Sequence, residues 1–104
     1  MRILFDQGTP VPLRRFLLGH RVATAFEQGW SNLGNGDLLR MAEAEFDLFL
    51  TTDQNLRYQQ NLAGRKLAIQ VLPTTNWLEI WQHVQLVVQA VDQAKPGEYR
   101  ELSW

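Results

Sequence analysis

Three aspartates are the residues of this chain best suited to chemistry. Asp6 follows an apolar run at residues 3–5, Asp53 follows a second run at residues 48–50, and Asp37 stands at the start of a predicted helix. Short apolar runs bounded by polar residues are typical of strands buried on both faces of a parallel sheet. Open α/β sheets bind ligands at the carboxyl ends of such strands. We therefore expect Asp6 and Asp53 to meet at one sheet edge, with Asp37 completing the cluster.

The chemistry expected of this cluster is that of a divalent metal ion. Carboxylates without a nearby histidine or thiolate are hard oxygen ligands, which favour Mg²⁺ or Mn²⁺ over zinc. Such an ion polarises a phosphoryl oxygen and activates a water molecule. Asp6, Asp37 and Asp53 are thus predicted both as metal ligands and as catalytic residues. Weaker candidates for contacts with a substrate are polar or basic residues near these positions: Thr52, Asn55, Arg14, Arg15 and Arg57.

Each aspartate also has a purely structural interpretation. The helix dipole alone favours an acid such as Asp37 in a first turn. Asp53 suits the N-cap of the helix that follows it. Asp6, with a glycine and a proline shortly after it, suits an Asx-turn. The threonine, the asparagine and the arginines equally suit turns and a solvated surface, so the prediction depends on the joint placement of the three acids.

Strands alternate with helices along the chain, which indicates an α/β fold with a mostly parallel sheet of four to five strands. Asn76 and Glu79 form a capping-box pattern before an apolar stripe of helical spacing, in which Trp77 and Trp81 are predicted to be core residues. Lys95, Pro96 and Gly97 end that helix. The expected strands are 2–5, 20–24, 48–51, 67–72 and an edge strand at 99–102. One expected helix begins at Pro12 and ends at Gly19. Three others span 37–46, 56–62 and 77–91.

Composition limits the classes of protein without selecting one. The 104 residues suit a single domain, 1–104, and 45% hydrophobic with 20% charged residues is ordinary for a globular protein. Zero cysteines exclude a disulfide framework and a thiolate metal site. No apolar run reaches the roughly 18 residues of a membrane span, and no signal-peptide pattern is present, so we expect a cytoplasmic protein without a membrane partner.

The net charge of −1 does not by itself suggest a nucleic-acid partner. It comes from 10 Lys and Arg against 11 Asp and Glu. If Asp6, Asp37 and Asp53 are metal ligands, 8 acidic residues remain against the 10 basic ones. The charge therefore permits an RNA substrate.

The chain resembles, over essentially its whole length, the small PIN-like family of bacterial and archaeal proteins of unassigned function. The resemblance lies in the blocks LFDQGTP, PLRRFL, GHRVATAFEQGW and NGDLLRMAEAEFDLFLTTDQNLRYQQNLAGR. It implies a PIN-like domain with a three-layer α/β/α sandwich and a Mg²⁺-dependent ribonuclease with metal positions at Asp6, Asp37 and Asp53. It also implies a toxin-like role beside a small antitoxin-like protein. Many relatives carry an acid where this chain has Gln7, and no fourth acid is assigned.

Two other functions remain as alternatives. Gln7, the neutral charge and the candidate interface residues Trp30 and Trp104 favour a catalytically weak or inactive protein-binding module. A receiver-like phospho-acceptor domain would use Asp53, a threonine after the fourth strand and the lysine of Lys95-Pro96. That reading is disfavoured because no strand separates the helix 77–91 from Lys95.

A homodimer is the last expectation from sequence. Leu78 and Leu86 widen the apolar stripe of the helix 77–91 beyond what one sheet face needs to cover. Trp104, just after the predicted edge strand, is a candidate anchor for a partner's pocket. A symmetric pair would align two carboxylate clusters along one groove.

Overall fold

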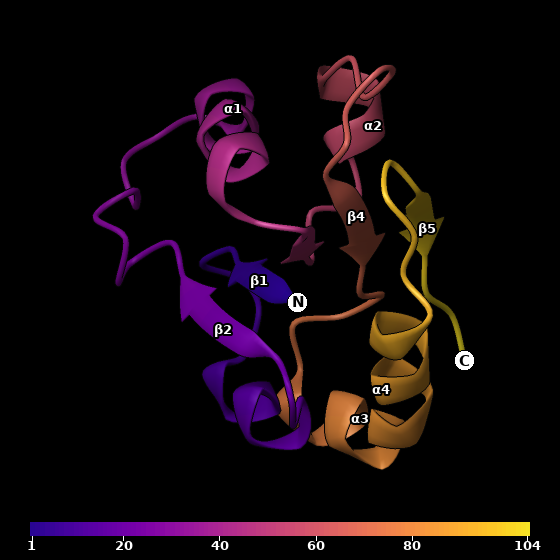
Figure 1. Cartoon of the computed structure of the whole chain (residues 1–104). Coiled ribbons are helices and arrows are strands. Elements are labelled where there is room, and N and C mark those ends of the chain that lie inside the picture. Colours follow the sequence, from indigo (N-terminus) through magenta and orange to yellow (C-terminus); the bar gives the residue numbers. More distant parts are fainter.

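The sheet is entirely parallel, and its strands lie in the order β2-β1-β3-β4-β5. The computed structural model describes all residues from Met1 to Trp104. Figure 1 shows helices on both sides of this sheet. The strands are β1 (Arg2–Phe5), β2 (Arg21–Thr24), β3 (Leu48–Thr51), β4 (Ala68–Val71) and β5 (Tyr99–Glu101).

The strands are connected through helices or helical turns, as parallel neighbours require. One connection, η1, is a 3₁₀ helix with Pro12 in its first turn. The Leu17 N–H bonds the carbonyl of Arg14, three residues back, and η1 ends at Phe16, so the predicted continuation to Gly19 is wrong. None of the helices is long and apolar enough to cross a membrane. The helical elements are η1 (Val11–Phe16), α1 (Asn35–Glu45), α2 (Leu56–Gln59), α3 (Trp77–Gln82) and α4 (Val84–Asp92).

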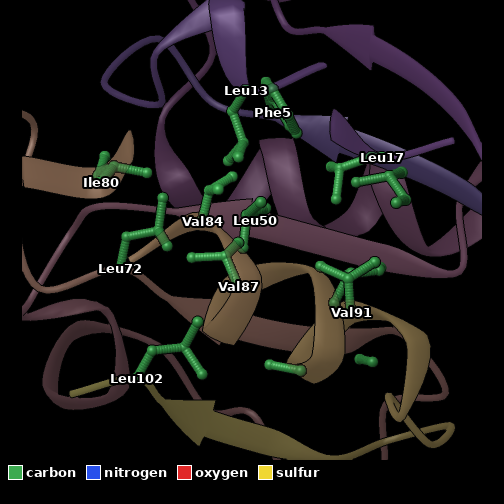
Figure 2. Close-up of a cluster of buried hydrophobic side chains, with 14 residues drawn as sticks. Phe5, Leu13, Leu17, Leu50, Leu72, Ile80, Val84, Val87, Val91 and Leu102 are labelled. Carbon is green, nitrogen blue, oxygen red and sulfur yellow. The ribbon is translucent and has the colours of Figure 1, made fainter. Parts of the chain in front are cut away.

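Alternation along each strand divides the buried apolar residues into two cores. In β1, Ile3 and Phe5 join a cluster with η1, α3 and α4, while Leu4 joins a cluster with α1 and α2 on the opposite face. Figure 2 shows the first cluster, in which Phe5 and Leu50 face Val84 and Val87. Every residue of β1 after the first, and all of β3 and β4, is buried. The molecule is therefore a three-layer α/β/α arrangement with a two-sided sheet.

The strand order places a topological switch point between β1 and β3. After β1 the chain adds β2 on one side, then crosses through α1 and adds β3 on the other side of β1. This is the order 2-1-3-4-5 of one doubly wound class, in which ligands bind outside the carboxyl ends of the strands at the switch point. Phe5 pairs with Leu50, so the residues that follow β1 and β3 emerge side by side.

The predicted helix at 77–91 is divided at His83. This residue leaves helical geometry (φ −118°, ψ 23°), and its ring stacks on Trp104 with centroids 4.7 Å apart. The break at His83 lets α3 pack against η1, where the ring centroids of Trp77 and Phe16 are 5.9 Å apart, while α4 packs on the sheet. As a result Trp81 is 51% exposed, and its prediction as a core residue is wrong.

Candidate functional site

One buried hydroxyl joins the two aspartates at the switch point. Thr51, the last residue of β3, is 1% exposed, and its Oγ1 donates to Oδ2 of Asp6. The same oxygen accepts the backbone N–H of Asp53 at 3.1 Å. The structure thus brings Asp6 and Asp53 to one sheet edge, as the parallel-strand argument predicts, and fixes them against a shared partner.

The second oxygen of Asp6 is held by its own loop. Oδ1 accepts from the backbone N–H of Thr9 at 3.1 Å and lies 2.7 Å from Thr9 Oγ1. Thr9 Oγ1 also lies 2.9 Å from the carbonyl oxygen of Leu50, and its single proton serves one of these acceptors at a time. Asp6 thus closes its own loop, although through the third residue on and not through the second, as an Asx-turn would. A carboxylate has about four acceptor positions, so a free one remains on Oδ2.

Asp53 is oriented by two donors and keeps more of its acceptor capacity. Oδ2 accepts from Nδ2 of Asn35 at 2.9 Å, and Oδ1 accepts from the backbone N–H of Asn55 at 2.9 Å. Asn55 is the N-cap of α2 and acts here through its backbone, not its side chain. Each oxygen of Asp53 therefore retains a free lone pair for a ligand.

Asp37 is not brought to this pair. It is exposed on α1 and pairs with Arg40 at 2.7 Å. No group of three or more histidine, aspartate or glutamate side chains is placed to hold a metal ion. The physical reason is the helix start: α1 begins at Asn35, two residues before the predicted start. At about 100° per residue, two residues turn a side chain to the opposite face, so Asn35 faces the sheet edge instead of Asp37.

A polar cavity of about 130 Å³ lies beside Asp6. Gln7, Ser31 and Asn35 contribute polar groups to its wall. The hydroxyl oxygen of Ser31 is buried and has no hydrogen-bond partner. Asn35 and Ser31 were missed by the sequence analysis; the turn dipeptide Asn35-Gly36 was the available signal for the first, and none marks the second. An unpartnered hydroxyl beside a carboxylate is a feature that a bound ligand or water would satisfy.

Thr52 lies where the loops after β1 and β3 approach most closely. A Cβ atom on Gly8 would lie 2.3 Å from Thr52 Oγ1. Only a glycine leaves room for that hydroxyl in its present position. Thr52 thus contacts the loop that follows Asp6 and is the sequence neighbour of Asp53.

The three arginines predicted to contact a substrate do not form one path. Arg14, on η1, forms an ion pair with Glu27 at 2.6 Å and lines a second cavity that also contains Asp6. Arg15 is exposed. Arg57 lies 3.6 Å from Glu101 on β5, and its hydrogen bond to the Tyr58 hydroxyl raises its pKa further. Of the three, Arg14 alone lines a cavity together with one of the two aspartates, Asp6.

The lysine that a receiver-like site would need is at the other end of the sheet. Lys95 lines a cavity with Met1, Arg2 and Asp47, at the amino ends of the strands. It precedes β5, as the sequence order implied. Asp53 therefore has no lysine partner of this kind in the fold.

The fold and this geometry define the class: a doubly wound α/β protein with a carboxylate pair at its switch point. Comparisons with family models, with curated proteins and with solved structures found no match to the chain. The carboxylate oxygens of Asp6 and Asp53 are potential ligands for a metal ion. Mg²⁺ usually keeps several waters and needs only one or two carboxylates. Asp6 lines the polar cavity, Asp53 is bonded to Asn35 in its wall, and each carboxylate has a free lone pair, which fits one hydrated ion of this kind.

Proposed function

We propose that this chain is a metal-dependent ribonuclease in which Asp6 and Asp53 hold one Mg²⁺ or Mn²⁺ ion. The observation that carries the proposal is at the β1/β3 switch point, where the Thr51 hydroxyl bonds both the Asp6 carboxylate and the backbone N–H of Asp53, and where Asp6 lines a polar cavity. Asp37 is left out of the metal set because it pairs with Arg40. The sequence resemblance to the PIN-like family supports the same function.

Neighbouring side chains orient the two aspartates and supply a hydroxyl to the substrate. Thr9 and Thr51 fix the Asp6 carboxylate, and Asn35 fixes Asp53, so that both present their free lone pairs without reorganisation. A bound ion would polarise a phosphodiester and activate water for in-line attack. Ser31 supplies a hydroxyl to a phosphate oxygen or to a water in the cavity.

The test is Mn²⁺-dependent cleavage of a fluorescent single-stranded RNA. Wild type should cleave, and Asp53→Asn should fall to the background rate because a neutral amide is a poor ligand for a hard cation. Asp37→Asn is the matched control and should retain the wild-type rate. Asn35→Ala should lose about 10- to 100-fold, as outer-shell changes do. Equal rates for wild type and Asp53→Asn, or no wild-type cleavage at high protein concentration, would refute the proposal.

The biological setting is proposed on the resemblance alone. It comprises a cytoplasmic toxin that acts on RNA, is neutralised by a small antitoxin-like protein and forms a homodimer. Leu78 and Trp81, 62% and 51% exposed on α3, are the apolar residues available for self-association. The rest of the stripe is less suited, since Leu86 packs partly against the core. Light scattering coupled to size exclusion tests the dimer: a monomer mass at tens of micromolar contradicts it.

A second candidate function is a non-catalytic protein-binding module. The observation that favours it is that Asp6 already has three donors from its own chain and no third acid lies beside the pair. Titration calorimetry with Mn²⁺ separates the two candidates. A single-site isotherm that is lost in Asp6→Ala contradicts the module, whereas absence of binding together with absence of cleavage supports it.

A further inference from the structure

A larger cavity is lined in part by Asp6, one of the two aspartates of the site. It has a volume of about 470 Å³ and contains Asp6 and Gln7, which also line the small polar cavity. Its size lies in the range of about 300–1,000 Å³ that is usual for small-molecule sites. The remaining wall comes from η1 and from the turn after β2: Thr9, Val11, Arg14, Thr24, Phe26 and Glu27.

Two apolar side chains form the open sides of this cavity. Phe26 is 77% exposed and Val11 is 53% exposed. Phe26 sits in a rigid turn, because Thr24 Oγ1 accepts from the Glu27 N–H at 3.1 Å and Glu27 Oε1 accepts from the Thr24 N–H at 2.9 Å. This reciprocal arrangement is a capping box, the sequence T-A-F-E. The ring is thus exposed to solvent yet held by a fixed backbone.

An ion pair with spare hydrogen-bonding capacity forms the polar side. Arg14 contacts Glu27 through both terminal nitrogens, at 2.6 and 3.2 Å. These bonds, together with the Thr24 N–H, hold the pKa of Glu27 below its usual value, so the carboxylate is ionised. Glu27 Oε2 accepts one bond and has room for another, whereas Nε of Arg14 is buried and has no partner. The pair therefore offers an acceptor on Glu27 to a ligand in the cavity.

We propose that this cavity binds the base of an RNA nucleotide adjacent to the phosphate that reaches Asp6 and Asp53. The inference rests on the proposed function and names the part of the substrate that the site recognises. An aromatic face beside a hydrogen-bonding pair is how proteins read unstacked bases, which stack on a ring and hydrogen-bond through their edges. Asp6 and Gln7 border both cavities, so a nucleotide whose base lies in the larger one places its phosphate beside Asp6.

The experiment measures nucleotide binding without catalysis. Amide chemical shifts are followed while each 5′-mononucleotide, or ribose 5-phosphate as the base-free probe, is added to the protein in EDTA. Wild type should bind the nucleotides more tightly than ribose 5-phosphate. Phe26→Ala should weaken nucleotide binding roughly 5- to 150-fold, the range found for removal of one stacking aromatic, and leave ribose 5-phosphate unchanged. Phe26→Trp should retain binding.

An exposed apolar residue outside the cavity provides a matched control. Leu18 is 83% exposed and does not line the cavity, so Leu18→Ala should leave nucleotide binding unchanged. Glu27→Gln should change the order of preference among the four bases, because the amide exchanges one acceptor for a donor. Equal binding of nucleotides and ribose 5-phosphate to wild type, or equal nucleotide binding by wild type and Phe26→Ala, would overturn the proposal.

The nucleotide-binding test and the ribonuclease test can fail independently of each other. If Asp53→Asn loses cleavage while Phe26→Ala changes neither nucleotide affinity nor the KM for RNA, the nuclease stands and the base site falls. If Phe26→Ala loses nucleotide binding and wild type cleaves nothing, the base site stands and the nuclease falls.

Discussion

Replacing Thr51 by valine removes the hydroxyl that joins the two aspartates and changes little else. The side chain is 1% exposed, and valine has nearly the same shape, so packing against the core is preserved. Two hydrogen bonds are lost at once: the one donated to Asp6 Oδ2 and the one accepted from the Asp53 N–H. Thr51→Val thus measures the free energy of the link itself.

The magnitude follows from the two bonds. A hydrogen bond to a charged group contributes ~1.5–3 kcal/mol, and we take the lower end, ~1.5, because Asp6 keeps its donors from Thr9. The partly buried N–H of Asp53 left without an acceptor costs about 1 kcal/mol more. The expected loss in the free energy of unfolding is about 2.5 kcal/mol, which lowers Tm by roughly 10–20 °C in a domain of this size.

Urea unfolding followed by tryptophan fluorescence is the assay, with an unchanged m-value as the check for two-state behaviour. Thr51→Ser is the control: it keeps the hydroxyl and loses only a buried methyl group, about 1 kcal/mol. In the background of Asp6→Asn, the effect of Thr51→Val should shrink, because the charged acceptor is gone. The reasoning is refuted if Thr51→Val stays within about 0.5 kcal/mol of wild type, or if Thr51→Ser costs as much.

Three further outcomes are expected. Asn76 accepts from the N–H of Glu79 at 3.1 Å, so Asn76→Ala should cost about 1 kcal/mol in urea unfolding while Asn76→Asp costs little; equal midpoints for all three proteins would contradict the cap. Burial, aided by Glu101, raises the pKa of Tyr99 from 10.0 to about 12, so the folded state favours the neutral phenol. The resulting stabilisation of the folded state is fully present below pH 10 and is lost as the pH rises toward about 12. Tyr99→Phe should flatten the stability profile in that window, and an unchanged profile refutes the assignment. Gly8→Ala should lower Tm because its Cβ meets Thr52, and Thr52→Ala should restore it; no recovery would mean that the hydroxyl is not the obstacle.

The strand framework could be predicted from sequence because buried strands leave a local signal. Residues 2–5 and 48–51 are strands with the predicted bounds, and the last strand begins at Tyr99 as expected. Apolar runs that end at polar residues mark such strands without any knowledge of the partner strand. The neighbourhood of Asp6 and Asp53 then followed from the geometry of parallel strands alone.

The remainder of the site depended on a helix start that the sequence marks poorly. Gly34 is the N-cap of α1 and offers no side chain to cap it, so the helix was predicted to start at Asp37, which is the third residue of α1 and lies in its first turn. The division at His83 was hidden for a different reason: the apolar stripe is periodic across it, and the ring that stacks on His83 comes from Trp104 at the far end of the chain. In contrast, Phe26 lies in a capping-box sequence, residues 24–27, whose threonine and glutamate are a local signal.

The all-parallel strand order also constrains how the molecule folds. No two neighbouring strands can be joined by a hairpin, so every pairing needs a crossover, and contacts between distant segments fold slowly. Asp6 and Thr51 are separated by 45 residues along the chain, and β1 cannot pair with the central strand β3 until β2 and α1 have been synthesised. During synthesis the apolar β1 therefore emerges long before its partner. The carboxylate pair is absent from any folding intermediate in which β3 has not docked, and its formation reports that event.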